Sequence, residues 1–263
     1  MKNIVFAMVL LLSSGLVQAQ VTENPEGSLE NPNFVKLNVM ALAGGKFSLE
    51  YERVLTKRIG VAVAFNLRPE KGLPFSSKIM DLVDDDEVNS LLDGMKSSSI
   101  GFAPEVKFYL SKKGYGRGFY LAPFVKYAKF DYSAPYNFNY YFEENGYSEQ
   151  RNETIPLSGD LTTVTAGLSA GVNFKLSNRI FLDWRIVGPG YGLSKGTLGG
   201  DITLNQYEQD GLREQLGDLK ESLNDLPLKF KMDYKVDGNG ADITLNKSPW
   251  ANIRSGLSIS YKF

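Results

Sequence analysis

The sequence contains neither histidine nor cysteine among its 263 residues. Without these side chains the protein cannot form a Ser-His-Asp triad, a thiol nucleophile, a disulfide or an ordinary zinc site. Its 29 basic and 30 acidic residues also lack the basic excess that an electrostatically driven nucleic-acid binder requires. We therefore predict no enzymatic activity, no cofactor or bound metal, and no nucleic-acid partner.

A long hydrophobic run is also missing after the first residues, which excludes an ordinary transmembrane helix there. The N-terminal MKNIVFAMVLLLSSGLVQAQ has a positive start, a short apolar stretch and small residues before a cleavage position. This pattern predicts a signal peptide over residues 1–19, followed by a flexible segment over residues 20–33.

The rest of the chain alternates between apolar and polar residues with a period of two, which is the pattern of β-strands. Eight such segments begin near residues 34, 47, 59, 100, 121, 164, 180 and 253. Their polar faces consist mainly of Gly, Ala, Ser and Asn, with a few charges of both signs. Small residues suit the crowded interior of a narrow barrel, and the apolar faces suit lipid, so this pattern favours a membrane barrel over a soluble sandwich.

Short and long connections alternate between these segments, as they do in an up-and-down outer-membrane barrel. The long outer loops are expected at about residues 69–98, 133–160 and 193–249. The predicted fold is therefore an all-β membrane protein: an eight-stranded antiparallel up-and-down transmembrane β-barrel over residues 34–263, with long outer loops carrying two short helices. A ten-stranded barrel that also uses LKFKMDYKV is the alternative, but its next turn would leave the C-terminus on the outer side.

Aromatic residues near both ends of the strands predict two interfacial girdles. The lower girdle is expected to contain Phe34, Tyr51, Phe108, Phe119, Phe174, Tyr261 and Phe263, and the upper one Phe65, Tyr127 and Trp250. Pro104 and Pro123 lie inside neighbouring strands, where each removes a backbone donor, and we expect local bulges there.

Several short motifs resemble those of small bacterial outer-membrane barrels, including the OmpA transmembrane-domain and OmpX-like group and related families of unknown function. They are FSLEYERVL, PEVKFYL, FYLAPFVKY and the terminal YKF. The resemblance implies an outer-membrane location in a Gram-negative bacterium, with outer-membrane lipid and the barrel-assembly machinery as partners. It also implies an assembly signal made of Leu257, Ile259, Tyr261 and Phe263.

Charged residues on the inward faces are expected to fill the barrel. They are Lys36, Glu50, Glu52, Glu105, Lys107, Lys126, Asp183, Arg185 and Arg254. An eight-stranded barrel is just wide enough for side chains, and unpaired charges in such a space are costly. These four acids and five bases therefore predict a salt-bridged plug that fixes the strand register, with a gated path through the network as the alternative.

Two outer loops carry leucine-rich helical patterns. The loop at residues 71–98 also contains an acidic run, which fits a solvated face better than a calcium site because it lacks EF-hand spacing. The loop at residues 197–249 predicts a leucine-striped helix ending at Pro227, and then a hairpin around Asp237-Gly238-Asn239-Gly240. The segment DITLN occurs twice, and its copies are expected to pair as extensions of the seventh and eighth strands above the membrane. The two helices are expected to pack together as a cap over the barrel mouth; the alternative is that they lie on the outer leaflet or bind a partner.

The loop at residues 133–160 is rich in tyrosine, which suits recognition of an extracellular protein or glycan. The candidate recognition residues are Tyr136, Tyr140, Tyr141 and Tyr147. The predicted function is a surface-exposed anchor or interaction protein with a plugged lumen and no catalytic turnover. The alternative is a channel or transporter for small or apolar solutes, gated by the loop helices.

Overall fold

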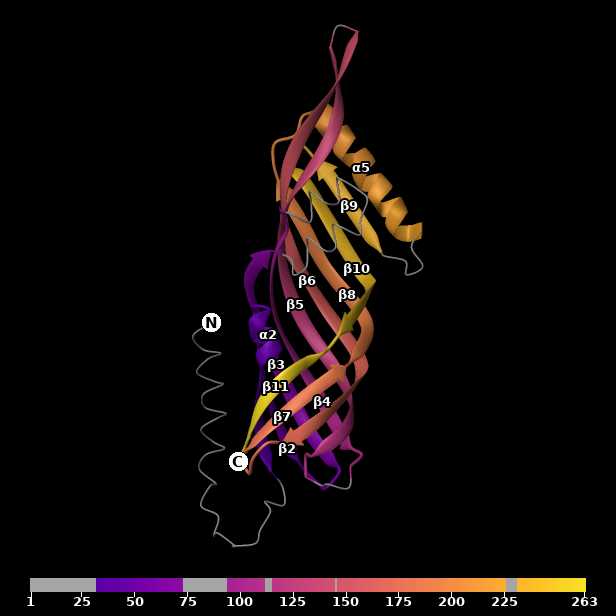
Figure 1. Cartoon of the computed structure of the whole chain (residues 1–263). Coiled ribbons are helices and arrows are strands. Elements are labelled where there is room, and N and C mark those ends of the chain that lie inside the picture. The colour runs from indigo at the N-terminus through magenta and orange to yellow at the C-terminus, as the bar shows by residue number, and fades with distance from the viewer. Residues whose placement is uncertain (1–31, 73–93, 112–114, 145, 226–230) are drawn as a thin grey trace. The chain divides into compact units, whose positions relative to one another are not determined.

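The computed structural model describes residues 32–72, 94–111, 115–144, 146–225 and 231–263. Eight of its strands form a closed antiparallel ring (Figure 1). In chain order they are β1 (Asn33–Asn38), β2 (Phe47–Val54), β3 (Ile59–Gly72), β4 (Lys96–Tyr109), β5 (Gly118–Glu144), β6 (Tyr147–Lys175), β7 (Ile180–Val187) and β11 (Gly256–Lys262). Because β1 pairs with β11 and β6 pairs with both β5 and β7, the predicted eight-stranded barrel is confirmed.

Beyond the ring, the sheet continues upward on one side (Figure 1). There β6 pairs with β8 (Pro189–Asp201), β8 pairs with β10 (Gly240–Ile253), and β10 pairs with β9 (Met232–Asp237). The predicted hairpin in the last outer loop is therefore present. The two DITLN copies do not pair with each other: the first begins where β8 ends, whereas the second lies inside β10.

The tyrosine-rich segment at residues 133–160 is a regular extension of β5 and β6 rather than a loop. The two strands stay paired without interruption from Gly118↔Asn173 to Glu144↔Tyr147. The reason is that apolar–polar alternation continues to the tip, and Phe138 and Ile155 of the two strands are both buried on the same face.

The first hairpin is shorter than its neighbours. Strand β1 ends at Asn38, whose side chain accepts a hydrogen bond from the Ala41 amide and caps a short helix, α2 (Val39–Ala43). The cap ends the strand at this point. As a result, Ser248–Ile253 of β10 pair with β8 on one side and, among the described residues, with no strand on the other.

The long helix α5 (Gln206–Asp225) begins with reciprocal hydrogen bonds between Asn205 and Glu208. It packs against β5 and β9 and buries Leu212 and Leu216 in a core on the concave face of the extended sheet. The predicted helix of the earlier loop lies at residues 73–93, outside the described residues. No described helix has the length and hydropathy to cross a membrane.

The outside of the ring carries an apolar belt, as the alternation predicts. Exposed members of the belt include Tyr51, Val61, Val63, Phe102, Val125, Val164, Leu168, Trp184, Ile259 and Tyr261. Soluble monomers rarely expose so large a contiguous apolar surface, whereas a membrane-spanning barrel requires it. Above the belt, exposed charges such as Lys129 and Asp131 mark the end of the lipid-facing part of β5.

Two predicted girdle residues and two predicted bulges are wrong. Phe34 and Trp250 point into the barrel, because they share the inward parity of Lys36 and Arg254; Phe34 is fully buried against Phe181. Pro104 and Pro123 cause no bulge, because β4 and β5 keep one register from Phe102↔Tyr127 to Phe108↔Leu121 while individual pairs are lost beside the prolines.

Candidate functional site

The lumen of the ring contains a compact network of buried charges. Four acids and four bases take part: Glu50, Glu52, Glu105, Asp183, Lys36, Lys107, Arg185 and Arg254. The formal charges therefore cancel within the network. Because buried ions are tolerated only when they are paired, this balance explains how so many charges fit inside a narrow barrel.

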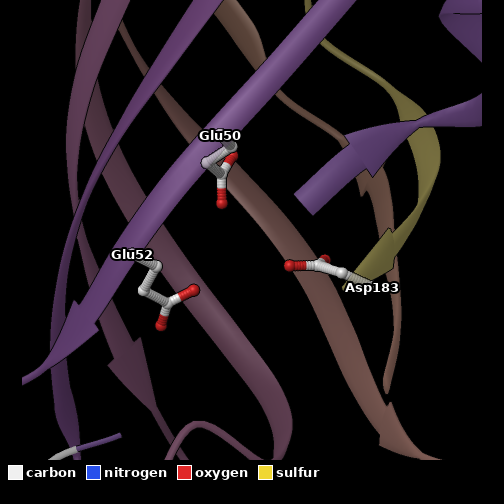
Figure 2. A group of neighbouring side chains, drawn as sticks. All are labelled: Glu50, Glu52 and Asp183. Atoms are coloured by element: carbon white, nitrogen blue, oxygen red, sulfur yellow. The ribbon is translucent and has the colours of Figure 1, made fainter. Parts of the chain in front are cut away.

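Three carboxylates from opposite walls, those of Glu50, Glu52 and Asp183, converge in the centre (Figure 2). Their oxygens lie within 4.8 Å of one another, which is a spacing that a metal ion could bridge. Two ammonium groups already lie among them. Lys107 Nζ is 2.5 Å from Glu50 and 3.1 Å from Glu52, and Lys36 Nζ is 2.5 Å from Glu52 and also contacts Asp183. The lysines thus supply the positive charge that the carboxylates require.

Two arginines extend the network upward. Arg185 donates to Glu50 at 2.9 Å and to Glu105 at 2.6 Å, and Arg254 donates to the other oxygen of Glu105 at 2.6 Å. The guanidinium group of Arg254 also lies 4.5 Å from the ring centre of Phe124. This cation–π contact ends the network with an aromatic side chain that is itself buried.

Aromatic side chains lie directly below the charges. The hydroxyl groups of Tyr109 and Tyr120 donate to Glu52 at 2.5 Å and to Asp183 at 2.7 Å, and their ring centres are 5.7 Å apart. Strand β3 makes room at this level with Gly60, where an added Cβ would lie 2.6 Å from the Glu52 carboxylate. The lumen is therefore filled by side chains at this level, and the network is held from below by fixed donors.

The ninth predicted lumen charge, Lys126, stands apart from this network. It faces the lumen one layer above Phe124, where the positive charges of Lys46 and Arg254 repel its ammonium group. Lys46 in turn lies near Arg68 and Arg254. Neither Lys46 nor Lys126 has an ion-pair partner among the described residues. The alternation identified Lys126 as facing inward. Lys46 directly precedes β2 and Arg68 lies in the outer part of β3; both share the inward parity of their strands but were not predicted as lumen charges.

An apolar cavity of about 290 Å³ lies above these cations, between the barrel and the core under α5. Its lining includes Tyr132, Leu161, Leu216, Leu245 and Trp250. Trp250, which lines the cavity, packs against Phe130 at a ring-centre distance of 5.6 Å. Burial raises the pKa of Tyr132 to about 12, so this hydroxyl stays protonated at neutral pH.

The four candidate recognition tyrosines do not share one surface. Tyr140 is buried in the core under α5, and Tyr136 packs against that core. Tyr141 and Tyr147, by contrast, are 61% and 82% exposed. Because residues on one strand alternate between faces, the single predicted surface is corrected to an exposed pair and a buried pair.

The residues of the assembly signal occupy the last strand of the ring. Leu257, Ile259 and Tyr261 pair with Trp184, Leu182 and Ile180 of β7, and the ring of Phe263 stacks on that of Tyr261. Ile259 and Tyr261 are exposed on the apolar belt. Recognition of these residues by the assembly machinery stays a prediction.

No family model and no curated protein matches the sequence. Among solved structures, the chain is similar to Acinetobacter baumannii CarO2, with 12% identity, a TM-score of 0.42, and coverage of 89% of this chain and 98% of that one. It is also similar to the N-terminal β-barrel domain of Pseudomonas aeruginosa OprF, with 10% identity, a TM-score of 0.22, and coverage of 89% and 95%. Similarities this low carry no argument about function. Within the described residues, the closed ring of eight antiparallel strands is established by the chain's own strand pairing.

Proposed function

We propose that the protein is a non-conducting anchor in the outer membrane of a Gram-negative bacterium, which presents its extended sheet and helix α5 at the cell surface. The belt of exposed apolar side chains supports the membrane location. The proposal that the barrel does not conduct is based on one observation, the neutral, buried ion-pair network. Tyr109 and Tyr120 bound this network below, and Phe124 bounds it above.

Passage of an ion through this lumen would require separating pairs such as Lys107–Glu50 and Arg185–Glu105, which are 2.5 and 2.6 Å long. Separating a buried pair leaves uncompensated charges at a cost of about 3–5 kcal/mol per pair. A gated channel would have to meet this cost with every opening. The same network would be stable without any ligand, because its charges already cancel.

Recording from planar bilayers tests this proposal. We expect no unitary current steps from the folded protein at moderate voltage, with an open porin in the same membrane as the positive control. Insertion is verified by protease cleavage of the outer part from one side of the membrane only. Steady, reproducible current steps from the wild-type protein would overturn the proposal.

The exposed tip of the β5–β6 hairpin is the part of the surface best suited to a protein or glycan partner. Tyr141 and Tyr147 are exposed there, and Arg151 stacks 4.3 Å from the ring centre of Phe142 while pairing with Glu149. Exposed aromatic and arginine side chains are the residues that dominate binding interfaces. Replacing both tyrosines with serine should abolish adhesion of expressing cells to a host-cell or glycan surface, and unchanged adhesion would contradict this role.

A further inference from the structure

We propose that the upper lumen and the cavity above it form a binding site for a single-chain amphipathic anion, whose apolar chain occupies the cavity and whose carboxylate or phosphate contacts Lys126 and Lys46. The site extends the proposed surface role. The binding site depends on the proposed function only because it assumes that the barrel lies in a membrane. It does not require the barrel to conduct ions.

The cavity has the character of a site for an apolar group. Its volume of about 290 Å³ is at the lower end of the range of small-ligand pockets. The side chains that close it, including Leu161, Leu216, Leu245 and Trp250, offer almost no hydrogen-bonding groups. A chain of roughly ten carbons therefore suits the cavity better than a polar solute does.

The polar end of the ligand is indicated by groups that lack partners. Lys126 lies in the same cross-strand row as Trp250, connected through Thr165 and Gly192. Thr165 is 2% exposed, and its hydroxyl oxygen has no hydrogen-bond partner. The side-chain amide of Asn252, the next inward residue below Trp250, is also buried without partners. Buried polar groups are nearly always hydrogen-bonded, so these groups indicate a missing partner.

The sign of that partner follows from the charges around it. The ion-pair network beneath, which includes Arg254, is neutral, whereas Lys126, Lys46 and Arg68 lie beside it without a carboxylate partner among the described residues. Within the described part of the chain, Arg68 donates hydrogen bonds to the Ser97 hydroxyl oxygen and to the Gly72 carbonyl. The excess of positive charge next to an apolar cavity therefore favours an anion with an apolar chain over a neutral or cationic one.

Access is available beside the first hairpin. Lys46 follows the turn after α2, and Ser248–Ile253 of β10 have no strand partner on that side among the described residues. Ile253 is 75% exposed and Met40 of α2 is 57% exposed, so the borders of this side are apolar. A ligand already dissolved in the membrane can therefore approach the cations without crossing the ion-pair network.

The two tryptophans of the chain permit a direct test. Trp184 lies on the lipid-facing belt, so the variant Trp184→Phe leaves Trp250 as the only indole. This protein is placed in phosphatidylcholine nanodiscs and titrated with 2-bromoundecanoate, whose bromine lies beside the carboxylate and quenches indole fluorescence on contact. We expect saturable quenching, at least tenfold weaker apparent affinity for the trimethylammonium compound with the same brominated chain, and comparable quenching by the corresponding alkyl phosphate.

Replacing Lys126 with Gln in that background should weaken binding of the bromocarboxylate by about tenfold to hundredfold, since a charge-assisted hydrogen bond is lost. Lys129→Gln is the matched control, because Lys129 is on the same strand but faces outward near Asp160. Ala134→Phe, which fills the cavity from β5, should abolish quenching. Each variant must show the folded form on a gel run without boiling.

Equal quenching by the anionic and cationic compounds would overturn the proposal, as would no quenching by any of them. Tighter binding of the carboxylate would identify a free fatty acid as the source, and tighter binding of the phosphate would identify a lipid headgroup. A failed quenching test with silent bilayers would reject this site alone, whereas current steps with normal quenching would reject only the non-conducting anchor.

Discussion

The ion-pair network makes a sharp prediction about Lys107. Its ammonium group is fully buried and lies within 3.4 Å of Glu50, Glu52, Glu105 and Asp183. The variant Lys107→Met keeps most of the side-chain volume but leaves four buried carboxylates with three basic partners. The ion-pair network would then carry one uncompensated negative charge.

Removing one partner of a buried ion pair lowers the free energy of unfolding by about 3–5 kcal/mol. This loss changes the ratio of folded to unfolded protein by roughly two to four orders of magnitude. Urea titration of the protein in lipid vesicles measures this cost through tryptophan fluorescence and the shift in gel mobility on boiling. The double variant Lys107→Met, Glu50→Gln removes one charge of each sign from a pair 2.5 Å long, so it should recover about half of the loss or more.

The control is Lys129→Met, which removes a lysine whose side chain is 44% exposed and lies 3.8 Å from Asp160. Exposed pairs contribute about 1 kcal/mol or less, so this variant should unfold close to the wild type. If Lys107→Met were as stable as the control, the network would not be a paired, water-poor plug. If the loss in free energy of unfolding for the double variant equalled the sum of the losses for Lys107→Met and Glu50→Gln alone, charge balance would not be what stabilises the network.

Three further predictions concern the outer part of the protein. Leu216→Ala should destabilise the core under α5 by about 2–5 kcal/mol, seen as faster proteolysis and hydrogen exchange of α5 with unchanged protection of the ring; unchanged exchange in α5 would contradict the burial of this leucine. Gly240→Ala should loosen the β9–β10 hairpin, because this residue has φ = 135° and a Cβ would lie 1.9 Å from the Gly200 carbonyl oxygen; the same protease pattern as wild type would refute it. Hydrogen bonds from Lys235 and from the Asn239 amide lower the pKa of Asp237. The ionised Asp237 should therefore stabilise the turn fully above the ordinary carboxyl pKa, and this stabilisation should be lost as the pH falls through the lowered pKa. An NMR titration midpoint for Asp237 at or above that of a free aspartate would exclude this effect.

Alternation along the strands predicted the ring and most of the lumen network, because a period of two assigns every residue to one face once the lipid-facing side is known. It correctly placed Lys36 and Glu50 in the lumen. It could not give the height of each residue along the barrel, which depends on the stagger between strands. Lys126 therefore faces the lumen, as predicted, but lies in a higher layer than the ion-pair network.

The errors have a common physical source. Phe34, Trp250 and Tyr140 were assigned from residue type and loop position, although their parity along the strand already indicated the inward face. The tyrosine-rich segment was interpreted as a loop because strands longer than a membrane crossing are uncommon. Lys46 and Arg68 were missed because they lie at the outer ends of β2 and β3, although their parity along the strands is also inward.

The order of layers along the lumen explains why binding should be sought on the outer side. The lower layers, Phe34 with Phe181 and then Tyr109 with Tyr120, are packed aromatic pairs, and the network above them satisfies its own charges. Among the described residues, Lys46 and Lys126 lie above Phe124 without a carboxylate partner, and Thr165, which pairs with Lys126, has a buried hydroxyl without a hydrogen bond. Because uncompensated buried groups cost free energy that packed and paired groups do not, the upper lumen is the layer in which a ligand would gain most by binding.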